Sequence, residues 1–146
     1  SNFTGSRDAA GYIRAHGIDR ARLFGAGVRC TELQPYFDHN IFGNYHSGGT
    51  EAYWDWSTAN DWPFPAPAPD LVRMSTWMAA QLAANPDYFL TASGFRADAL
   101  NGQALRRRPD YRLIAQFSGG LFWKERIIEP IGFELYEHVR AVKRPT

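Results

Sequence analysis

The chain has 146 residues, a length that fits one domain and leaves no room for two. With 45% hydrophobic and 21% charged residues it can bury a substantial core, which excludes a disordered chain. Sixteen basic and fifteen acidic residues are interspersed, which argues against a nucleic-acid-binding protein, and no stretch approaches the roughly 20 apolar residues of a membrane span. We therefore expect a single domain over residues 3–146, after a Ser1-Asn2 remnant of tag removal.

A helix and a short strand open the chain. Ser6 is a suitable N-cap, apolar residues recur at helical spacing as far as His16, and Gly17 is a typical helix stop. The apolar run at residues 22–24, which Gly25 ends, predicts a buried strand.

The next stretch, residues 28–37, is ambiguous. Thr31 and Gln34 match a capping box, whereas Pro35 would fall inside the first turns of the helix. Residues 40–43 then predict a second short strand that ends at a glycine.

Glycines at residues 25–27 follow the first predicted strand, as in a dinucleotide-binding fingerprint. That fingerprint needs a third glycine where Cys30 stands, and Pro35 interferes with the helix that should follow. We therefore expect no nucleotide and no other cofactor. Cys30 is the only cysteine, and its expected role is that of an inert buried side chain.

Residues 44–69 differ from the rest of the chain. They combine adjacent glycines, four prolines and six large aromatic residues, and prolines at alternate positions preclude a regular helix. Flat rings with interleaved carboxylates suit a sugar-binding or partner-binding surface, although the rings could instead fold back over the core. The predicted binding residues are His46, Glu51, Tyr53, Trp54, Asp55, Trp56 and Trp62.

The second half of the chain alternates helices and strands. Asp70 is a helix cap before a stripe of apolar residues, and the helix should stop near Asn85 because Pro86 follows. Further on we expect a strand at 88–92, a helix around 97–104 that Asn101-Gly102 could split, and strands at 111–117 and 133–139.

A Pro-Asp-Tyr sequence occurs twice, at residues 86–88 and 109–111, each time between a helix and a strand. Two joints of one kind favour repeated βα units. The sequence therefore predicts a three-layer α/β fold, with a mostly parallel sheet of four to six strands and an antiparallel last strand.

Recognisable catalytic and metal-binding motifs are absent from the sequence. There is no Gly-x-Ser-x-Gly, the motif of a nucleophilic serine. There is also no His-Glu-x-x-His, the motif of a zinc site, so we expect no metal. Glu51, Asp55 and Asp61 could supply a carboxylate pair, but their separation does not follow from sequence. The basic run at 106–108 is interpreted as a helix end, where cations complement the helix dipole. The histidines are His16, His39, His46 and His138.

Several segments together resemble a known arrangement. They are residues 9–17 followed by 22–24, then 85–91, 105–114 and 133–138. In this order they resemble the C-terminal water-exposed domain of polytopic bacterial membrane glycosyltransferases that use lipid-linked sugars. The family's usual Gly-Gly-Tyr-aromatic stretch and Asp-Gly-Arg strand end are missing, and residues 40–44 stand in their place.

The resemblance implies a location and a role. Because the catalytic carboxylates of that family lie in loops of the membrane part, no catalytic residue is carried over to this chain. The implied role is a non-catalytic, extracytoplasmic domain on the periplasmic face of the inner membrane. Its implied partners are the membrane-embedded part of the parent chain and a glycan or lipid-linked sugar. The alternative is a free-standing, hydrolase-like enzyme with its site at the strand ends beside residues 44–69.

Overall fold

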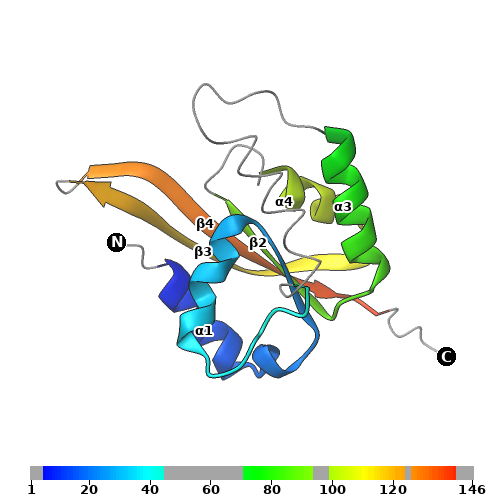
Figure 1. The fold of residues 1–146 in the computed structure, drawn as a ribbon, viewed down its shortest axis with the longest axis horizontal. Coiled ribbons are helices and arrows are strands. Elements are labelled where there is room, and N and C mark those ends of the chain that lie inside the picture. Colours follow the sequence, from blue (N-terminus) through cyan, green and yellow to red (C-terminus); the bar gives the residue numbers. More distant parts are fainter. Residues whose placement is uncertain (1–4, 45–70, 94–98, 124–125, 141–146) are drawn as a thin grey trace.

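The computed structural model has a mixed α/β fold built on one four-stranded sheet (Figure 1). It describes residues 5–44, 71–93, 99–123 and 126–140. In chain order the elements are helix α1 (Gly5–Ala15), 3-10 helix η1 (Ile18–Arg20), strand β1 (Leu23–Ala26), 3-10 helix η2 (Val28–Tyr36), helix α3 (Leu71–Ala83), strand β2 (Tyr88–Ser93), helix α4 (Ala99–Arg106), strand β3 (Tyr111–Trp123) and strand β4 (Arg126–His138).

The strand order is β1-β2-β4-β3, and only β1 and β2 are parallel. Strand β4 is antiparallel to both of its neighbours, β2 and β3. The predicted α/β class, the four strands and the antiparallel last strand are confirmed. The predicted mostly parallel sheet is wrong, because β4 turns back from β3 and inserts between β2 and β3.

The two Pro-Asp-Tyr joints lie on the two sides of β4 but differ by one residue in register, since Tyr88 pairs with Glu137 and Tyr111 pairs with His138. Glu137 of β4 pairs with Tyr88 on one side and with Arg112 on the other. The backbone N–H of His138 donates to the carbonyl of Asp87 at 2.9 Å. Strands β2 and β3 therefore run in the same direction, as the repeated joint implies, but they are not neighbours.

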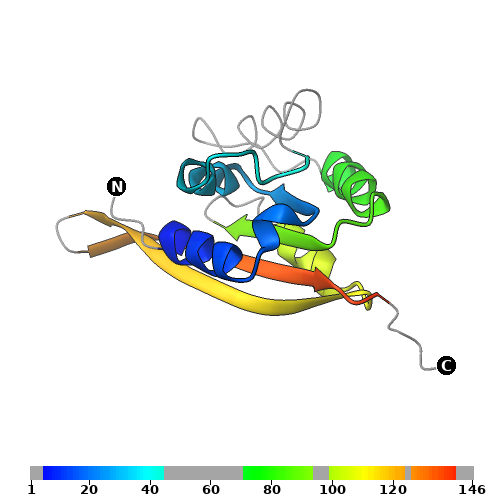
Figure 2. The ribbon, with the colours of Figure 1, turned by 90° about the horizontal axis from the view of Figure 1, so that it is seen from below.

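Two clusters of buried side chains lie on opposite faces of the sheet. Consecutive residues of a strand point to opposite faces, so Phe89 and Leu90 of β2 belong to different clusters, as do Leu135 and Tyr136 of β4. The cluster of Leu90 is completed by α1, η1 and η2, and the cluster of Phe89 by α3 and α4. Figure 2 shows α1 lying against the long β3–β4 hairpin, which extends beyond the last residue of β2.

Most of the predicted elements are present near their predicted positions. The first helix ends before Gly17, whose φ of 67° is the left-handed conformation that glycine adopts readily. The α3 helix, the β2 strand and the helix end at Arg106 are confirmed. The ambiguous stretch is a 3-10 helix that contains Pro35. The predicted strand at 40–43 is wrong, since these residues form no strand.

Candidate functional site

Residues 45–70, which contain all of the predicted binding residues, lie outside the described residues. This applies to every residue that we expected to bind there: His46, Glu51, Tyr53, Trp54, Asp55, Trp56 and Trp62. The structure does describe Asn44, the first residue of the predicted segment 44–69, and helix α3, which follows it.

Asn44 holds the start of the segment against the outer edge of β1. Its side-chain Oδ1 accepts a hydrogen bond from the backbone N–H of Gly25, and its Nδ2 donates to the carbonyl of Gly25, both at 2.9 Å. The same Nδ2 donates to Oε1 of Gln81 in α3 at 2.8 Å. The backbone N–H of Gly43 also donates to the carbonyl of Leu23, at 2.8 Å. The buried amide side chain of Asn44 thus pairs both backbone groups of Gly25 at the open edge of β1.

The two glycines near the end of β1 make room for close contacts. A Cβ atom on Gly25 would lie 2.9 Å from the ring of Phe42. Gly27 has a φ of 117°, and a Cβ atom there would lie 2.9 Å from the carbonyl oxygen of Ala92. The Gly-Ala-Gly sequence is therefore explained by packing. Cys30 is fully buried, as predicted.

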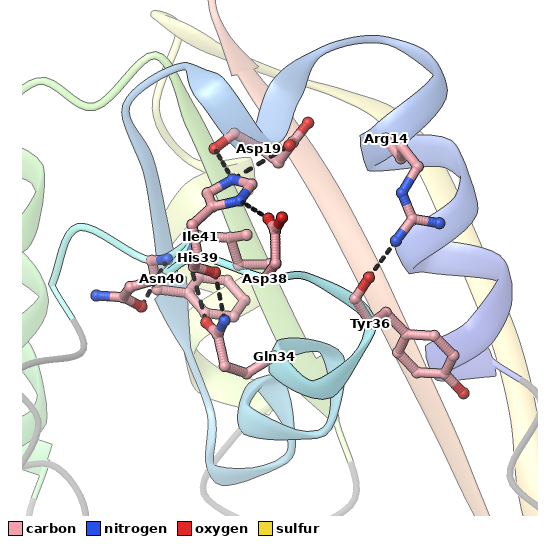
Figure 3. Close-up of polar contacts among 9 residues, drawn as sticks. Arg14, Asp19, Gln34, Tyr36, Asp38, His39, Asn40 and Ile41 are labelled. Atoms are coloured by element: carbon pink, nitrogen blue, oxygen red, sulfur yellow. Dashed lines mark hydrogen bonds and ion pairs between the residues drawn. The ribbon is translucent and has the colours of Figure 1, made fainter.

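A second amide side chain, that of Gln34, holds the chain that leads to Asn44 (Figure 3). Its Nε2 donates to the carbonyl of His39 at 2.5 Å, and its Oε1 accepts from the backbone N–H of Ile41 at 3.1 Å. Oδ1 of Asn40 accepts from the backbone N–H of Phe42 at 3.3 Å. Residues 40–43 form no strand because side chains occupy the backbone groups that a strand would pair.

His39 lies between two carboxylates in the same view (Figure 3). Its Nδ1 is 2.9 Å from Oδ1 of Asp38, and its Nε2 is 3.2 Å from Oδ2 of Asp19. The hydrogen bond with Asp38 raises the pKa of His39, and the bond from His39 lowers the pKa of Asp38. Since both ring nitrogens face acceptors, the imidazolium form fits best and neither nitrogen is available to take a proton from a substrate.

The pairing of His39 should make stability depend on pH. A raised folded-state pKa means that the stabilisation is present below the ordinary value of 6.5 and is lost as the pH rises through the folded-state pKa. At the acid end, the lowered pKa of Asp38 means that the pair persists as the pH falls to 3.8 and is lost below it. Arg20, the other charged group near His39, opposes its protonation.

Urea unfolding of the wild type and of His39→Gln at several pH values measures this effect. The difference in unfolding free energy between them should be largest near pH 5 to 6 and should shrink above pH 7. A difference that does not change with pH would show that the imidazolium contributes nothing.

The other described histidines also have local partners. His16 stacks on Tyr12 with ring centroids 4.0 Å apart. Nε2 of His138 lies 3.4 Å from Oδ2 of Asp110, which also accepts from Arg108 at 2.7 Å. Within the described ranges, no three His, Cys, Asp or Glu side chains are grouped so that they could hold a metal ion.

A cleft of about 310 Å³ lies between α4 and strands β2, β3 and β4. Its centre is Glu134, whose Oε1 accepts from Nη1 of Arg106 and from the hydroxyl of Tyr136, both at 2.6 Å. Its Oε2 accepts from Nε2 of Gln116 at 3.1 Å. Burial raises the pKa of Glu134, but the hydrogen bonds from Tyr136 and Gln116, together with the charge and hydrogen bond of Arg106, hold this pKa below its usual value.

Sequence reasoning missed this cleft, although one signal was available. Gly102 inside a predicted helix was interpreted as a weak point. In the structure it allows α4 to approach β4, because a Cβ atom on Gly102 would lie 3.0 Å from Oε1 of Glu134.

Comparisons with known proteins give no relative: no family model, curated protein or solved structure matches this chain. None of the helices described is both long and apolar enough to cross a membrane.

Proposed function

We propose that this chain is an accessory domain of a membrane glycosyltransferase-like protein. In this proposal it lies outside the cytoplasm, binds through residues 45–70 and does not catalyse by itself. The family resemblance of residues 9–17 and 85–91 supports the location. The observation that carries the binding role is the hydrogen bond between Asn44 and Gln81.

This bond joins the two sides of the aromatic segment. Asn44 is the first residue of the predicted segment 44–69, and Gln81 belongs to the helix that follows it, so the 2.8 Å contact fixes the start of the segment against that helix. Asn44 is itself fixed to Gly25 of the sheet. A segment whose first residue is held against the sheet and α3 has less conformational entropy to lose on binding, which favours a binding role.

The polar groups of the described residues also favour a non-catalytic domain. His39 is held by Asp19 and Asp38, and Glu134 by Arg106. Side chains that are held in ion pairs of this kind stabilise the fold. A catalytic base, in contrast, keeps one atom directed at the substrate.

The reading frame that encodes this chain tests the location. We expect membrane-spanning segments upstream of residue 3. Alkaline phosphatase fused after Arg140 of this chain, within the full-length protein, should be active, since this enzyme folds outside the cytoplasm. An upstream frame without any membrane span, or an inactive fusion that is well expressed, would overturn the proposal.

The exposure of three indoles tests the binding surface. We expect Trp54, Trp56 and Trp62 to be exposed, because a binding surface must reach its partner. In a variant with Trp77 and Trp123 replaced by phenylalanine, acrylamide should quench the remaining fluorescence almost as strongly as it quenches free tryptophan. Strong protection of the three indoles from quenching would mean that they are buried against the core.

The partner is tested with lipid vesicles. The chain should bind vesicles that carry polyprenyl-phosphate sugars more tightly than plain vesicles of the same lipids. The variant Trp54→Ala/Trp56→Ala/Trp62→Ala should lose that preference, whereas Trp77→Phe should keep it. Equal binding to both vesicle types would leave the membrane-embedded part of the parent protein as the partner.

A free-standing hydrolase-like enzyme is a second candidate. It is favoured by the cleft at Glu134, since Thr91 near the carboxyl end of β2 lines it, and ligands of α/β sheets gather at such ends. Hydrolysis of chromogenic glycosides or esters that disappears in Glu134→Gln would establish it in place of the accessory role.

We also infer a three-layer arrangement. It is supported by the two core clusters, because α1 and η2 pack with Leu90 and Leu135, whereas α3 and α4 pack with Phe89 and Tyr136.

A further inference from the structure

We propose that the cleft between α4 and the sheet is a binding site for a small uncharged ligand with several hydroxyl groups. The described residues that line it belong to α4 and to strands β2, β3 and β4, and the proposal does not rest on the role of residues 45–70. Its volume of about 310 Å³ is at the lower end of the range of small-molecule pockets, roughly 300–1,000 Å³. A ligand of the size of one monosaccharide ring fits this volume.

The floor of the cleft is a polar strip across three strands. Thr91 of β2 pairs with Glu134 of β4, and Glu134 pairs with Gln116 of β3. Residues paired directly across a sheet point to the same face, so the three side chains stand in one row. Thr91 is only 4% exposed, whereas Gln116 is exposed, so the strip runs from a buried end at β2 to an open end at β3.

A glycine in the central strand leaves the hollow beside this row. Two residues before Glu134, on the same face, β4 has Gly132, which pairs with Ser118 of β3. Because Gly132 has no side chain, it leaves open the space between Ser118 and the row. Glycine within a strand often marks a place where a ligand approaches the backbone closely.

Helix α4 forms the wall. Gly102, Gln103 and Arg106 line the cleft from this helix. Gly102 lets the helix approach the sheet without displacing Glu134. A Cβ atom at residue 102 would lie only 3.0 Å from Oε1 of Glu134. The wall and the floor are joined by the 2.6 Å ion pair between Arg106 and Glu134.

The charges of the cleft select against an ionic ligand. Arg106 and Glu134 neutralise each other, and a charged ligand would have to separate them. Among the described residues, the other polar groups that line the cleft are the amides of Gln103 and Gln116 and the hydroxyls of Thr91 and Ser118. Each of these both donates and accepts, as does a ligand hydroxyl, so alternating hydrogen bonds can form on the floor and the wall.

NMR titration of the ¹⁵N-labelled 146-residue chain tests the site. The probes are methyl glucoside, methyl mannoside, methyl galactoside and myo-inositol, with glucuronate and glucosamine as charged counterparts. We expect saturable shifts of the backbone amides of Gly102 and Gly132 and of the side-chain amides of Gln103 and Gln116 with at least one neutral probe. The charged counterparts should bind at least tenfold more weakly.

Two variants check that the response belongs to the cleft. Gln116→Met keeps the size of an exposed side chain but removes its amide, and should weaken binding about tenfold, the usual effect of one lost hydrogen bond. Arg112→Gln, on the same strand but outside the cleft, should bind as the wild type does. The variant Trp54→Ala/Trp56→Ala/Trp62→Ala should also bind normally, which separates this site from the aromatic segment.

The proposal is overturned if none of the neutral probes shifts these resonances. It is equally overturned if a charged probe binds more tightly than its neutral counterpart, or if Gln116→Met and Arg112→Gln bind alike.

Discussion

Replacing Asn44 with alanine should lower the free energy of unfolding by about 3 kcal/mol. The change removes both hydrogen bonds to Gly25 and the one to Gln81. The N–H and C=O of Gly25 would stay buried at the sheet edge without these partners, and each buried group left unsatisfied costs about 1–3 kcal/mol. Urea unfolding followed by far-UV circular dichroism measures the loss.

Asn40→Ala is the matched control. It removes an amide of the same type four residues earlier, but the hydrogen bond that Asn40 accepts from the backbone N–H of Phe42 is long at 3.3 Å. We expect a loss of about 0.5 kcal/mol. Equal losses in the two variants would mean that the edge of β1 is satisfied without Asn44, and the proposed anchoring of the aromatic segment would lose its basis.

Replacing Gly27 with alanine should cost about 3 kcal/mol of stability. With a φ of 117°, Gly27 has a backbone conformation that residues with a Cβ rarely adopt. The added Cβ would also meet backbone, at 2.9 Å from the carbonyl oxygen of Ala92, and a backbone atom in a paired strand cannot move aside easily. Thermal or urea unfolding measures the change.

Gly11→Ala makes the same chemical change with the opposite expected sign. Gly11 lies within helix α1, and no described atom outside its own helix backbone lies within 4 Å of its Cβ position. Alanine has the higher helix propensity, so stability should rise by about 0.5–1 kcal/mol. If Gly27→Ala were tolerated as well as Gly11→Ala, the glycine pair at the end of β1 would need an explanation other than packing.

Local patterns in the sequence were sufficient for most individual elements. The helix that ends before Gly17, the α3 stripe and the β2 strand after Pro86 each depend on residues that are close together in the chain. Periodicity, caps and stops act over one or two turns, and they can therefore be recognised without knowledge of the fold.

The predicted strand at residues 40–43 shows where local pattern was insufficient. Its short apolar run is typical of a strand, but Gln34 and Asn40 take its backbone groups through their side chains. The cleft at Glu134 was missed for a related reason. It depends on Gly102 and Gly132, which come from different elements and meet only in the folded chain.

By itself the sequence determined the α/β class, the order of the elements from Tyr88 onward with the parts of β3 and β4 at 111–117 and 133–138, and the common direction of β2 and β3. Each of these follows from short-range chemistry, including the repeated Pro-Asp-Tyr joint. Only the tertiary structure decided which strands are neighbours. Inserting β4 between β2 and β3 places Leu135 and Tyr136 in the two core clusters, with Glu134 between Thr91 and Gln116. The last strand pairs with a strand much earlier in the chain, from Ser93 opposite Gly132 to Tyr88 opposite Glu137. This pairing is a choice among long-range contacts, and the free energy that decides it comes from packing across the whole sheet.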